Sequence, residues 1–246
     1  MSAAHVPLVV AGRPLGRIIP DVAAVLRQLP ALFGESASGF RLLDAELSRD
    51  DRGALLDRAA LALREAGLVP GWRSERCVLY DEHELEIARF ERGAFRTLGL
   101  QNRAVHVNGL RADGRLWTAR RSRKKASAPG KLDNLAAGAI TAGDEPLSCA
   151  QRELWEEAGV PAALAQSVQL TGRRLRSLRP IRHGYHDEMV FCADLLLPDD
   201  FTPACQDGEV DGFLCMTAAE AGAALGGGEF AVEAGLVLAD WLARHG

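Results

Sequence analysis

Apolar positions recur at helical spacing in two segments of the first hundred residues. The pattern over residues 20–34 predicts a helix that Pro30 ends or kinks. A second helix is expected to begin after Ser48, whose spacing from Asp51 resembles a capping box, and to stop at Gly67. The inward stripe of this second helix would consist of Leu55, Leu56, Ala59, Ala60 and Leu63.

The next apolar segment changes to the period of a strand. Residues 77–92, CVLYDEHELEIARFER, alternate in their second arm and therefore predict a strand, a turn and a second strand. His83 falls in the turn, where we expect it to be exposed. Residues 1–102 are accordingly predicted to form a small α+β domain, in which no catalytic constellation is visible.

Beyond residue 103 the pattern becomes mainly that of strands. Residues 104–120, AVHVNGLRADGRLWTAR, read as two strands around the turn Asp113–Gly114. Residues 222–228, GAALGGG, are expected to form a loop. Strands mixed with helices predict an α/β domain over residues 103–246, a mixed sheet flanked by helices. Its further strands are expected near residues 168–170, 188–197 and 208–216, and its closing helix over residues 233–245.

Composition and charge narrow the class of protein. The formal net charge of −4 on 246 residues gives no reason to expect a nucleic acid or an anionic membrane as a partner. No apolar run approaches the ~20 residues that cross a bilayer, and the segment VPLVVAG is too short for a signal sequence. The five cysteines contain no C-x-x-C pair, which is typical of reduced thiols. We therefore expect a soluble, cytoplasmic protein. Its oligomeric state stays open, with a homodimer among the alternatives.

An unusual concentration of acidic residues follows Gly138. A helix is predicted from Pro146 to Gly159, with Glu153, Glu156 and Glu157 on one face because they are spaced i, i+3 and i+4. Like charges at this spacing repel, whereas grouped carboxylates are what Mg²⁺ or Mn²⁺ prefers as ligands. A divalent-cation site is therefore predicted, with an ordinary solvated acidic face as the alternative. The inward stripe is expected to be Leu147, Ala150, Leu154 and Ala158.

The same segment resembles the signature of the Nudix hydrolases, G-x5-E-x7-R-E-U-x-E-E-x-G-U, where U is a bulky aliphatic residue. The only departure is Asp144, where the family has Glu; this residue would either support the site or simply cap the helix. The resemblance implies an α/β/α sandwich with a mixed sheet, preceded here by the small α+β domain. The positions in register are Gly138, Arg152, Glu153, Leu154, Glu156, Glu157, Gly159 and Val160.

The resemblance also implies roles for these residues. Glu153 and Glu157 would be the main metal ligands, assisted by Glu156 and by the carbonyl of Gly138. Glu153 would thereby be catalytic, and Arg152 would act by orienting a carboxylate. The implied reaction is hydrolysis of a small-molecule diphosphate, in the family a nucleoside diphosphate linked to another group.

A basic loop, RRSRKK, precedes the acidic segment. Arg121 and Lys125 are the best candidates for binding diphosphate oxygens, since a guanidinium fork and an ammonium charge both suit them; the alternative is a solvated loop. Members of the resembled family often draw one more carboxylate from beyond the signature, as a metal ligand or a general base. Glu209, at the beginning of a predicted strand, is the first candidate and Glu188 the second.

Further sequence features leave their roles open. The basic run over residues 173–188 would contact substrate or simply lie at the surface, and His183 and His186 are expected to be local hydrogen-bonding residues. Aromatic residues that could line a pocket for a substrate ring, each alternatively part of the core, are Trp117, Tyr185 and Phe213.

Four further segments resemble one Nudix subgroup that carries an extra N-terminal domain and occurs alone or fused to thiamine pyrophosphokinase. They are AVHVNGL, PGKLDNLAAG, DFTPACQDGEVDGF and the C-terminal ARHG. This resemblance implies hydrolysis of thiamine diphosphate, or its oxidised analogues, to the monophosphate. The rivals are a hydrolase of ADP-ribose or another nucleotide diphosphate, and a Nudix-like sensor that binds without cleaving. Isopentenyl-diphosphate isomerase is disfavoured because Ala136 and Ala137 occupy the place of its cysteine.

Overall fold

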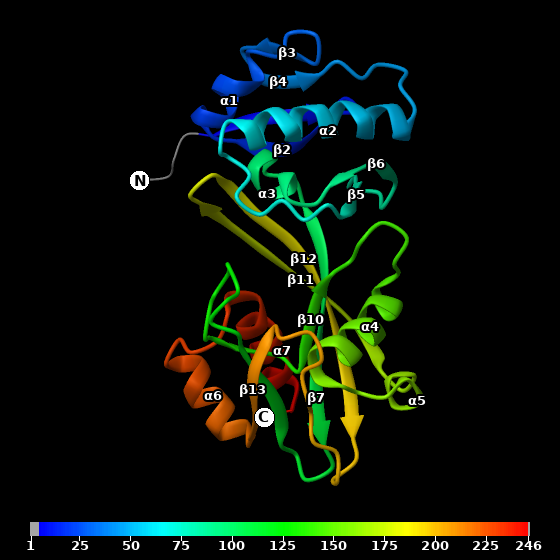
Figure 1. The fold of residues 1–246 in the computed structure, drawn as a ribbon, viewed down its shortest axis with the longest axis vertical. Helices are drawn as coiled ribbons and strands as arrows, with labels where there is room; N and C mark the ends of the chain where they lie inside the picture. Colours follow the sequence, from blue (N-terminus) through cyan, green and yellow to red (C-terminus); the bar gives the residue numbers. More distant parts are fainter. Residues whose placement is uncertain (1–4, 246) are drawn as a thin grey trace. The chain divides into compact units, whose positions relative to one another are not determined.

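The computed structural model describes residues 5–245, which cluster into two compact units (Figure 1). Unit 1 runs to Asn102 and also includes Thr141–Gly143 and Leu178–Glu188; unit 2 comprises Arg103–Ile140, Asp144–Ser177 and the chain from Met189 onward. The prediction of domains 1–102 and 103–246 stays a prediction. Unit 1 first ends at Asn102, where the predicted first domain ends, but the segments Thr141–Gly143 and Leu178–Glu188 also cluster with it. The last residue of ARHG lies outside the described residues.

Unit 1 contains a four-stranded sheet that the sequence pattern did not predict. Its order is β2-β1-β4-β3, with β1 parallel to β4 and the other neighbours antiparallel. Helix α1 spans Pro20–Leu26 and ends before Pro30, so of the two alternatives the helix ends and does not continue with a kink. The chain turns after α1, and Leu32 and Phe33 enter the core instead, Phe33 as the first residue of β3. The strands are β1 (Val6–Val10), β2 (Arg13–Ile18), β3 (Phe33–Ser36) and β4 (Gly39–Leu42).

The other elements of unit 1 match the predicted pattern. Helix α2 spans Arg49–Glu65, and the Ser48 hydroxyl accepts a hydrogen bond from the Asp51 amide at 3.1 Å, which confirms the expected cap. The predicted hairpin is formed by β5 (Arg76–Tyr80) and β6 (Glu86–Glu91), and His83 is exposed in its turn. A short helix, α3 (Ala94–Leu98), follows. The core of unit 1 includes Leu8, Phe40, Leu56, Phe90 and Phe95.

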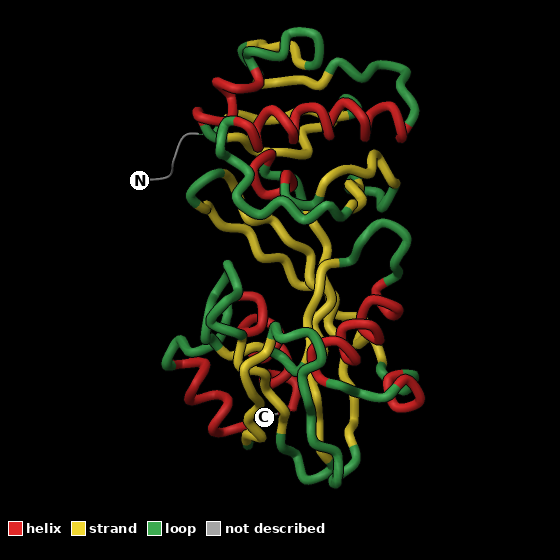
Figure 2. Tube along the Cα trace, viewed as in Figure 1, coloured by secondary structure: helices red, strands yellow, loops and turns green. Residues whose placement is uncertain are grey.

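A seven-stranded sheet forms the centre of unit 2 (Figure 2). Its main order is β11-β12-β7-β8-β13, while β10 pairs with β7 and β9 pairs with β8. The predicted hairpin around Gly114 is confirmed, since β7 and β8 pair antiparallel on either side of it. The strands are β7 (Asn102–Arg111), β8 (Leu116–Arg121), β9 (Leu132–Asp133), β10 (Ala136–Ala139), β11 (Gln169–Ile181), β12 (Gly184–Leu197) and β13 (Val210–Met216).

Helices cover both faces of this sheet. Neighbouring strand residues point to opposite faces, and Trp117 packs on the core beneath α4 (Pro146–Ala158), whereas Leu116 packs with α6 (Ala218–Gly226) and α7 (Val232–His245). A short helix, α5 (Ala162–Ala165), follows α4. This layering confirms the predicted α/β class, a mixed α/β fold with an α/β/α sandwich.

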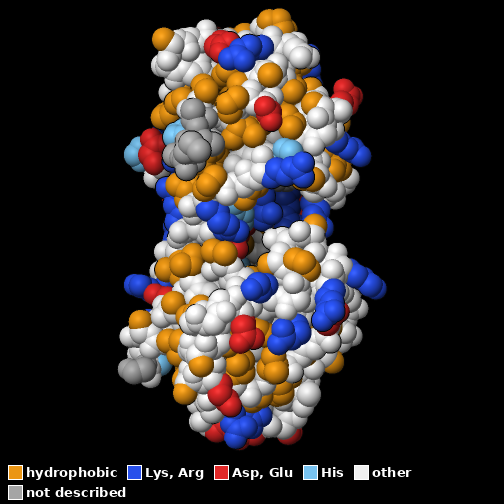
Figure 3. Space-filling model, turned by 90° about the vertical axis from the view of Figure 1, so that its left-hand side faces the viewer, with side chains coloured by type: hydrophobic (Ala, Val, Ile, Leu, Met, Phe, Trp, Pro, Cys, Tyr) orange, Lys and Arg blue, Asp and Glu red, His pale blue; other side chains and the backbone are white. Residues whose placement is uncertain are grey.

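The loop predicted at residues 222–228 is wrong. Helix α6 continues to Gly226, because a capping box between Thr217 and Glu220 starts it and because it buries Ala221 and Ala224 against the sheet. The following glycines then end it. No helix among the described residues is long and apolar enough to cross a membrane. On the face drawn in Figure 3, exposed hydrophobic side chains lie scattered among charged ones.

Candidate active site

Helix α4 carries the acidic residues and has defined ends. Pro146 begins it, the side chains of Glu145 and Ser148 form a reciprocal cap, and Gly159 ends it in the left-handed conformation with φ of 65°. The N-cap is thus Glu145. The alternative role of Asp144 as the cap is wrong, because its carboxylate instead accepts a hydrogen bond from Arg152 at 3.3 Å.

The buried face of α4 differs from the predicted stripe at its start. Ala150, Leu154 and Ala158 are buried as expected, but Leu147 is 40% exposed. Cys149 takes its place, since the packing of α4 on β10 begins there, with the Cys149 sulfur 3.4 Å from the carbonyl of Ala139. Glu153 and Glu157 are buried on the same side of the helix.

Burial has a large effect on these two carboxylates. Glu157 is 5% exposed, and it accepts hydrogen bonds from the Ala137 amide at 2.9 Å and from Lys125 Nζ at 3.1 Å. Burial raises the pKa of Glu157 to about 7; Lys125 opposes this rise, whereas the negative charges of Asp133 and Glu153 add to it. Burial likewise raises the pKa of Glu153 to about 7, against the opposing charge of Arg152. Two such carboxylates side by side would gain from a shared cation.

Gly138 allows the backbone of β10 to approach Glu153. A Cβ atom added at Gly138 would collide with the Glu153 carboxylate. The glycine of the signature is therefore required sterically, because any side chain would displace a carboxylate of the site. It also leaves the Gly138 backbone close to that carboxylate.

Arg152 binds carboxylates of the site. Its Nη1 donates to Glu153 at 2.7 Å and to Glu156 at 3.0 Å, and its Nη2 donates to Asp144. Glu156 itself is half-exposed. This geometry fits the orienting role expected for Arg152, and it explains how the helix tolerates its glutamates.

The basic loop between β8 and β9 brings Lys125 to the carboxylates. Lys125 forms ion pairs with both Glu157 and Glu209. Burial lowers the pKa of Lys125, but the charge of Glu157 and the hydrogen bond to Glu209 outweigh this, so its pKa lies above the ordinary value. Two residues far apart in sequence, Lys125 and Glu209, are thereby brought to the acidic helix.

Arg121, the other candidate for diphosphate binding, is held by hydrogen bonds to Asp133 and Ser127. Its Nη1 lies 2.5 Å from Asp133 Oδ2, and its Nε and Nη2 donate to the Ser127 carbonyl at 3.2 and 2.8 Å. Sequence reasoning missed Asp133, which is 5% exposed. The available signal was a pair of polar residues, Asp133 and Asn134, inside the otherwise apolar run LDNLAAGAI.

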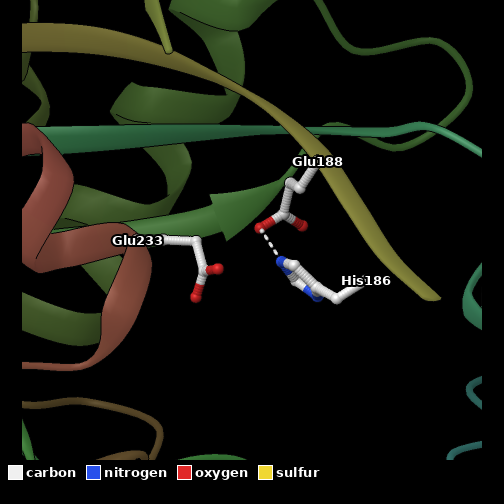
Figure 4. A group of neighbouring side chains, drawn as sticks. All are labelled: His186, Glu188 and Glu233. Atoms are coloured by element: carbon white, nitrogen blue, oxygen red, sulfur yellow. Dashed lines mark ion pairs between the residues drawn. The ribbon is translucent and has the colours of Figure 1, made fainter. Parts of the chain in front are cut away.

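The other sequence candidates have partners elsewhere. His186 and Glu188 are buried neighbours on β12, with Nε2 and Oε1 3.4 Å apart; Figure 4 draws this pair, and also Glu233, which accepts a hydrogen bond from Ser177 at 2.7 Å. Within the second basic run, Arg173 pairs with Asp240 at 2.7 Å. Of the two downstream candidates, Glu209 is the one that shares Lys125 with the acidic helix.

The donor set fits a hard divalent cation. Glu153 and Glu157 could hold it, with Glu156 and the Gly138 carbonyl as further oxygen donors. All four are oxygen ligands, which Mg²⁺ and Mn²⁺ prefer over nitrogen or sulfur. Such an ion would favour the ionised form of the two buried carboxylates, which burial disfavours.

Comparison with known proteins gives matches to two family models, to curated relatives and to solved structures. A family model described as the NUDIX domain matches residues 100–233, and one described as a domain of unknown function, DUF4743, matches residues 1–102. The chain is 32% identical to Nudix hydrolase 24, chloroplastic, and 30% identical to Nudix hydrolase 20, chloroplastic, both from Arabidopsis thaliana. Each match covers 98% of this chain and 68% of the relative. The crystal structure of DR0079 from Deinococcus radiodurans has a similar fold, with a TM-score of 0.52 and 24% identity over 69% of this chain and 98% of that one.

Proposed function

Because the chain belongs to the Nudix hydrolase family, we propose that it uses Mg²⁺ or Mn²⁺ to hydrolyse thiamine diphosphate, or its oxidised analogues, to the monophosphate. The observation that carries the metal-dependent chemistry is the burial of Glu153 and Glu157 on one side of α4, with Lys125 paired to Glu157. A non-catalytic sensor is a weaker alternative, because the chain retains all three glutamates of the helix and buries two of them.

In this proposal Glu153 and Glu157 hold the cation, assisted by Glu156 and the Gly138 carbonyl. The bound cation would neutralise charge on the diphosphate and make the attacking water more acidic. Arg152 contributes indirectly, since its hydrogen bonds at 2.7 and 3.0 Å fix the Glu153 and Glu156 carboxylates.

The remaining side chains bind phosphate oxygens and move the proton. Lys125 supplies positive charge at the acidic helix and Arg121 supplies it beside Asp133, and both side chains suit diphosphate oxygens. Glu209 is proposed to take the proton from the attacking water, a role worth roughly 10²–10⁴-fold in rate. Its ion pair with Lys125 would hold it beside the scissile phosphate.

The thiamine part of the proposal rests on the subgroup resemblance and on an aromatic surface. Trp117 and Phe213 lie on neighbouring strands and pack on the same core as α4. The indole nitrogen of Trp117 is buried and has no hydrogen-bond partner within residues 5–245, so it could donate to a ring substituent of a substrate. Tyr185, the third aromatic candidate, belongs to unit 1.

A nucleotide diphosphate such as ADP-ribose is the second candidate. The observation that favours it is the same aromatic pair, Trp117 and Phe213, because a purine stacks on such a surface as well as a pyrimidine does. Loss of the thiazolium charge should favour the oxidised thiamine analogues if no carboxylate faces the ring.

A comparison of three substrates tests the proposal. We would measure kcat/KM with Mg²⁺ for oxidised thiamine diphosphate, thiamine diphosphate and ADP-ribose, and identify the phosphate products. The expected result is inorganic phosphate and the corresponding monophosphate from each thiamine compound, with the highest kcat/KM for the oxidised form. If ADP-ribose gives the highest kcat/KM, the substrate assignment fails while the diphosphate chemistry survives.

A further inference from the structure

Asp133 is a buried carboxylate of unit 2 that belongs to none of the assigned groups. It lies at the end of β9, where its Oδ1 accepts a hydrogen bond from the Asn134 amide at 2.9 Å and its Oδ2 lies 2.5 Å from Arg121 Nη1. We propose that Asp133 is a positioning residue, which fixes the guanidinium of Arg121 so that it can bind the substrate diphosphate. This inference rests on the proposed function.

The hydrogen bonds of Arg121 explain why its orientation matters. A guanidinium has five N–H donors in one plane. Asp133 takes one of them and the carbonyl of Ser127 takes one from Nε and one from Nη2. Two donors remain for a ligand, and their direction is set once the other three are fixed. The Arg121 side chain is only 15% exposed, so it cannot reorient freely in solvent.

A chain of buried hydrogen bonds supports the segment that carries Asp133. His106 Nδ1 lies 2.8 Å from Asn134 Oδ1, Asn134 Nδ2 donates to Asn108 at 2.9 Å, and Asn108 Nδ2 donates to Asp194 at 2.9 Å. An ionised Asp194 can only accept a hydrogen bond, and this fixes the donor and the acceptor in each of the three hydrogen bonds. His106 must therefore carry its proton on Nδ1 to donate to Asn134. His106, Asn108 and Asn134 are each less than 7% exposed.

The ion pair of Asp133 with Arg121 is not explained by a contribution to folding stability alone. A buried ion pair such as Asp133–Arg121 is often no more stabilising than apolar side chains of the same volume. The hydrogen bonds of Arg121 to Asp133 and Ser127 instead hold its guanidinium in one orientation, which serves a binding site. Both Asp133 oxygens are already used by Arg121 and Asn134, which makes it a support rather than a metal ligand.

A double-mutant cycle tests the inference. The variants are Asp133→Asn, Arg121→Ala and the two combined, and the probe is imidodiphosphate, a non-hydrolysable diphosphate, bound by the full chain with Mn²⁺. We expect Asp133→Asn to raise the Kd of imidodiphosphate and the KM of the substrate roughly 10-fold, the scale of one charge-assisted hydrogen bond, with kcat changed less. In the Arg121→Ala background, Asp133→Asn should have no further effect, because the two residues act as one unit.

The matched control is Asp44→Asn in unit 1. Asp44 forms a comparable buried pair with Arg52 at 2.7 Å. The side chains of Asp44 and Arg52 are 5% and 12% exposed, against 7% and 15% for the side chains of Asp133 and Arg121. The Asp44→Asn substitution should lower the Tm of the protein while leaving the Kd of imidodiphosphate and the KM of the substrate unchanged. If Asp133→Asn does not fold, Asp133→Glu keeps the charge and displaces the guanidinium, and should raise KM with Tm retained.

The outcomes separate this inference from the function on which it rests. If the wild-type chain does not bind imidodiphosphate, the proposed function fails. If the wild type binds it and the effects of Asp133→Asn and Arg121→Ala are additive in free energy, Asp133 acts independently of Arg121 and the inference is overturned. An unchanged KM in a folded Asp133→Asn or Asp133→Glu variant overturns it as well.

Discussion

Replacing Glu157 with Gln should make the metal-free protein more stable while removing its activity. The pKa of Glu157 is raised from 4.5 to about 7 in the folded chain, so keeping it ionised at pH 8 costs the folded state about 3 kcal/mol. Gln keeps the shape and can still accept from the Ala137 amide, and the attraction between ionised Glu157 and Lys125 is already part of that pKa. A net gain of about 3 kcal/mol is therefore expected for the Gln variant at pH 8.

The sign of this effect depends on pH. Since the folded pKa of Glu157 lies above its unfolded value, the wild type loses stability as pH rises from about 4.5 through 7. The Gln variant has no such loss. Its advantage should be small at pH 5, where Glu157 is protonated in the folded chain, and largest at pH 8.

Thermal unfolding in EDTA at pH 5 and pH 8 measures the stability, and steady-state kinetics with Mg²⁺ measures the activity. At pH 8 the variant should gain several degrees in Tm and lose at least about 100-fold in kcat, since a metal ligand is gone. A purified Glu157→Gln protein that retains more than about a tenth of wild-type kcat would refute the assignment of this residue as a ligand. A lower Tm at pH 8 than the wild type would refute the electrostatic reasoning.

Three further predictions test other parts of the site. Ala at Arg121 or Lys125 should weaken transition-state binding by about 1.5–3 kcal/mol, and an unchanged kcat/KM would return these residues to a solvated loop. Gly138→Ala should lower kcat at least about 10-fold, because the added Cβ would displace the Glu153 carboxylate. The control Gly226→Ala should leave kcat unchanged, because a Cβ at that position meets no atom within 4 Å. Equal effects of the two substitutions would contradict the steric reasoning. Glu209→Gln should lower kcat by roughly 10²–10⁴-fold without weakening Mn²⁺ binding, and a parallel loss of Mn²⁺ affinity would make this residue a ligand instead of the base.

Local patterns in the sequence predicted the elements whose signals lie close together in the chain. The cap at Ser48, the turn at Gly114 and the end of α4 at Gly159 all depend on residues within a few positions of one another. The four-stranded sheet of unit 1 was missed because its parallel pair, β1 and β4, joins distant segments. The glycine-rich run before Gly228 was misread because capping at Thr217 and burial of Ala221 outweigh the low helix propensity of glycine.

Some features of the candidate site could likewise be predicted from local sequence patterns, and others could not. The spacing of Glu153, Glu156 and Glu157 follows from one helix and could be predicted from the sequence. The sequence could not predict that Glu157 is buried and Leu147 exposed, because this depends on where α4 packs against β10. Asp133 had no motif of its own; its role appears only when β8 and β9 pair and bring it to Arg121.

Direct Mn²⁺ binding tests the central claim without reference to any substrate. Electron paramagnetic resonance of Mn²⁺ at pH 8 would compare the wild type with the double variant Glu153→Gln, Glu157→Gln. We predict that the wild type binds at least one Mn²⁺ per chain, displaceable by Mg²⁺, and that the double variant, although folded, loses this binding because two buried carboxylates are gone. Equal Mn²⁺ affinity in the two proteins would contradict the assignment of helix α4 as the metal site.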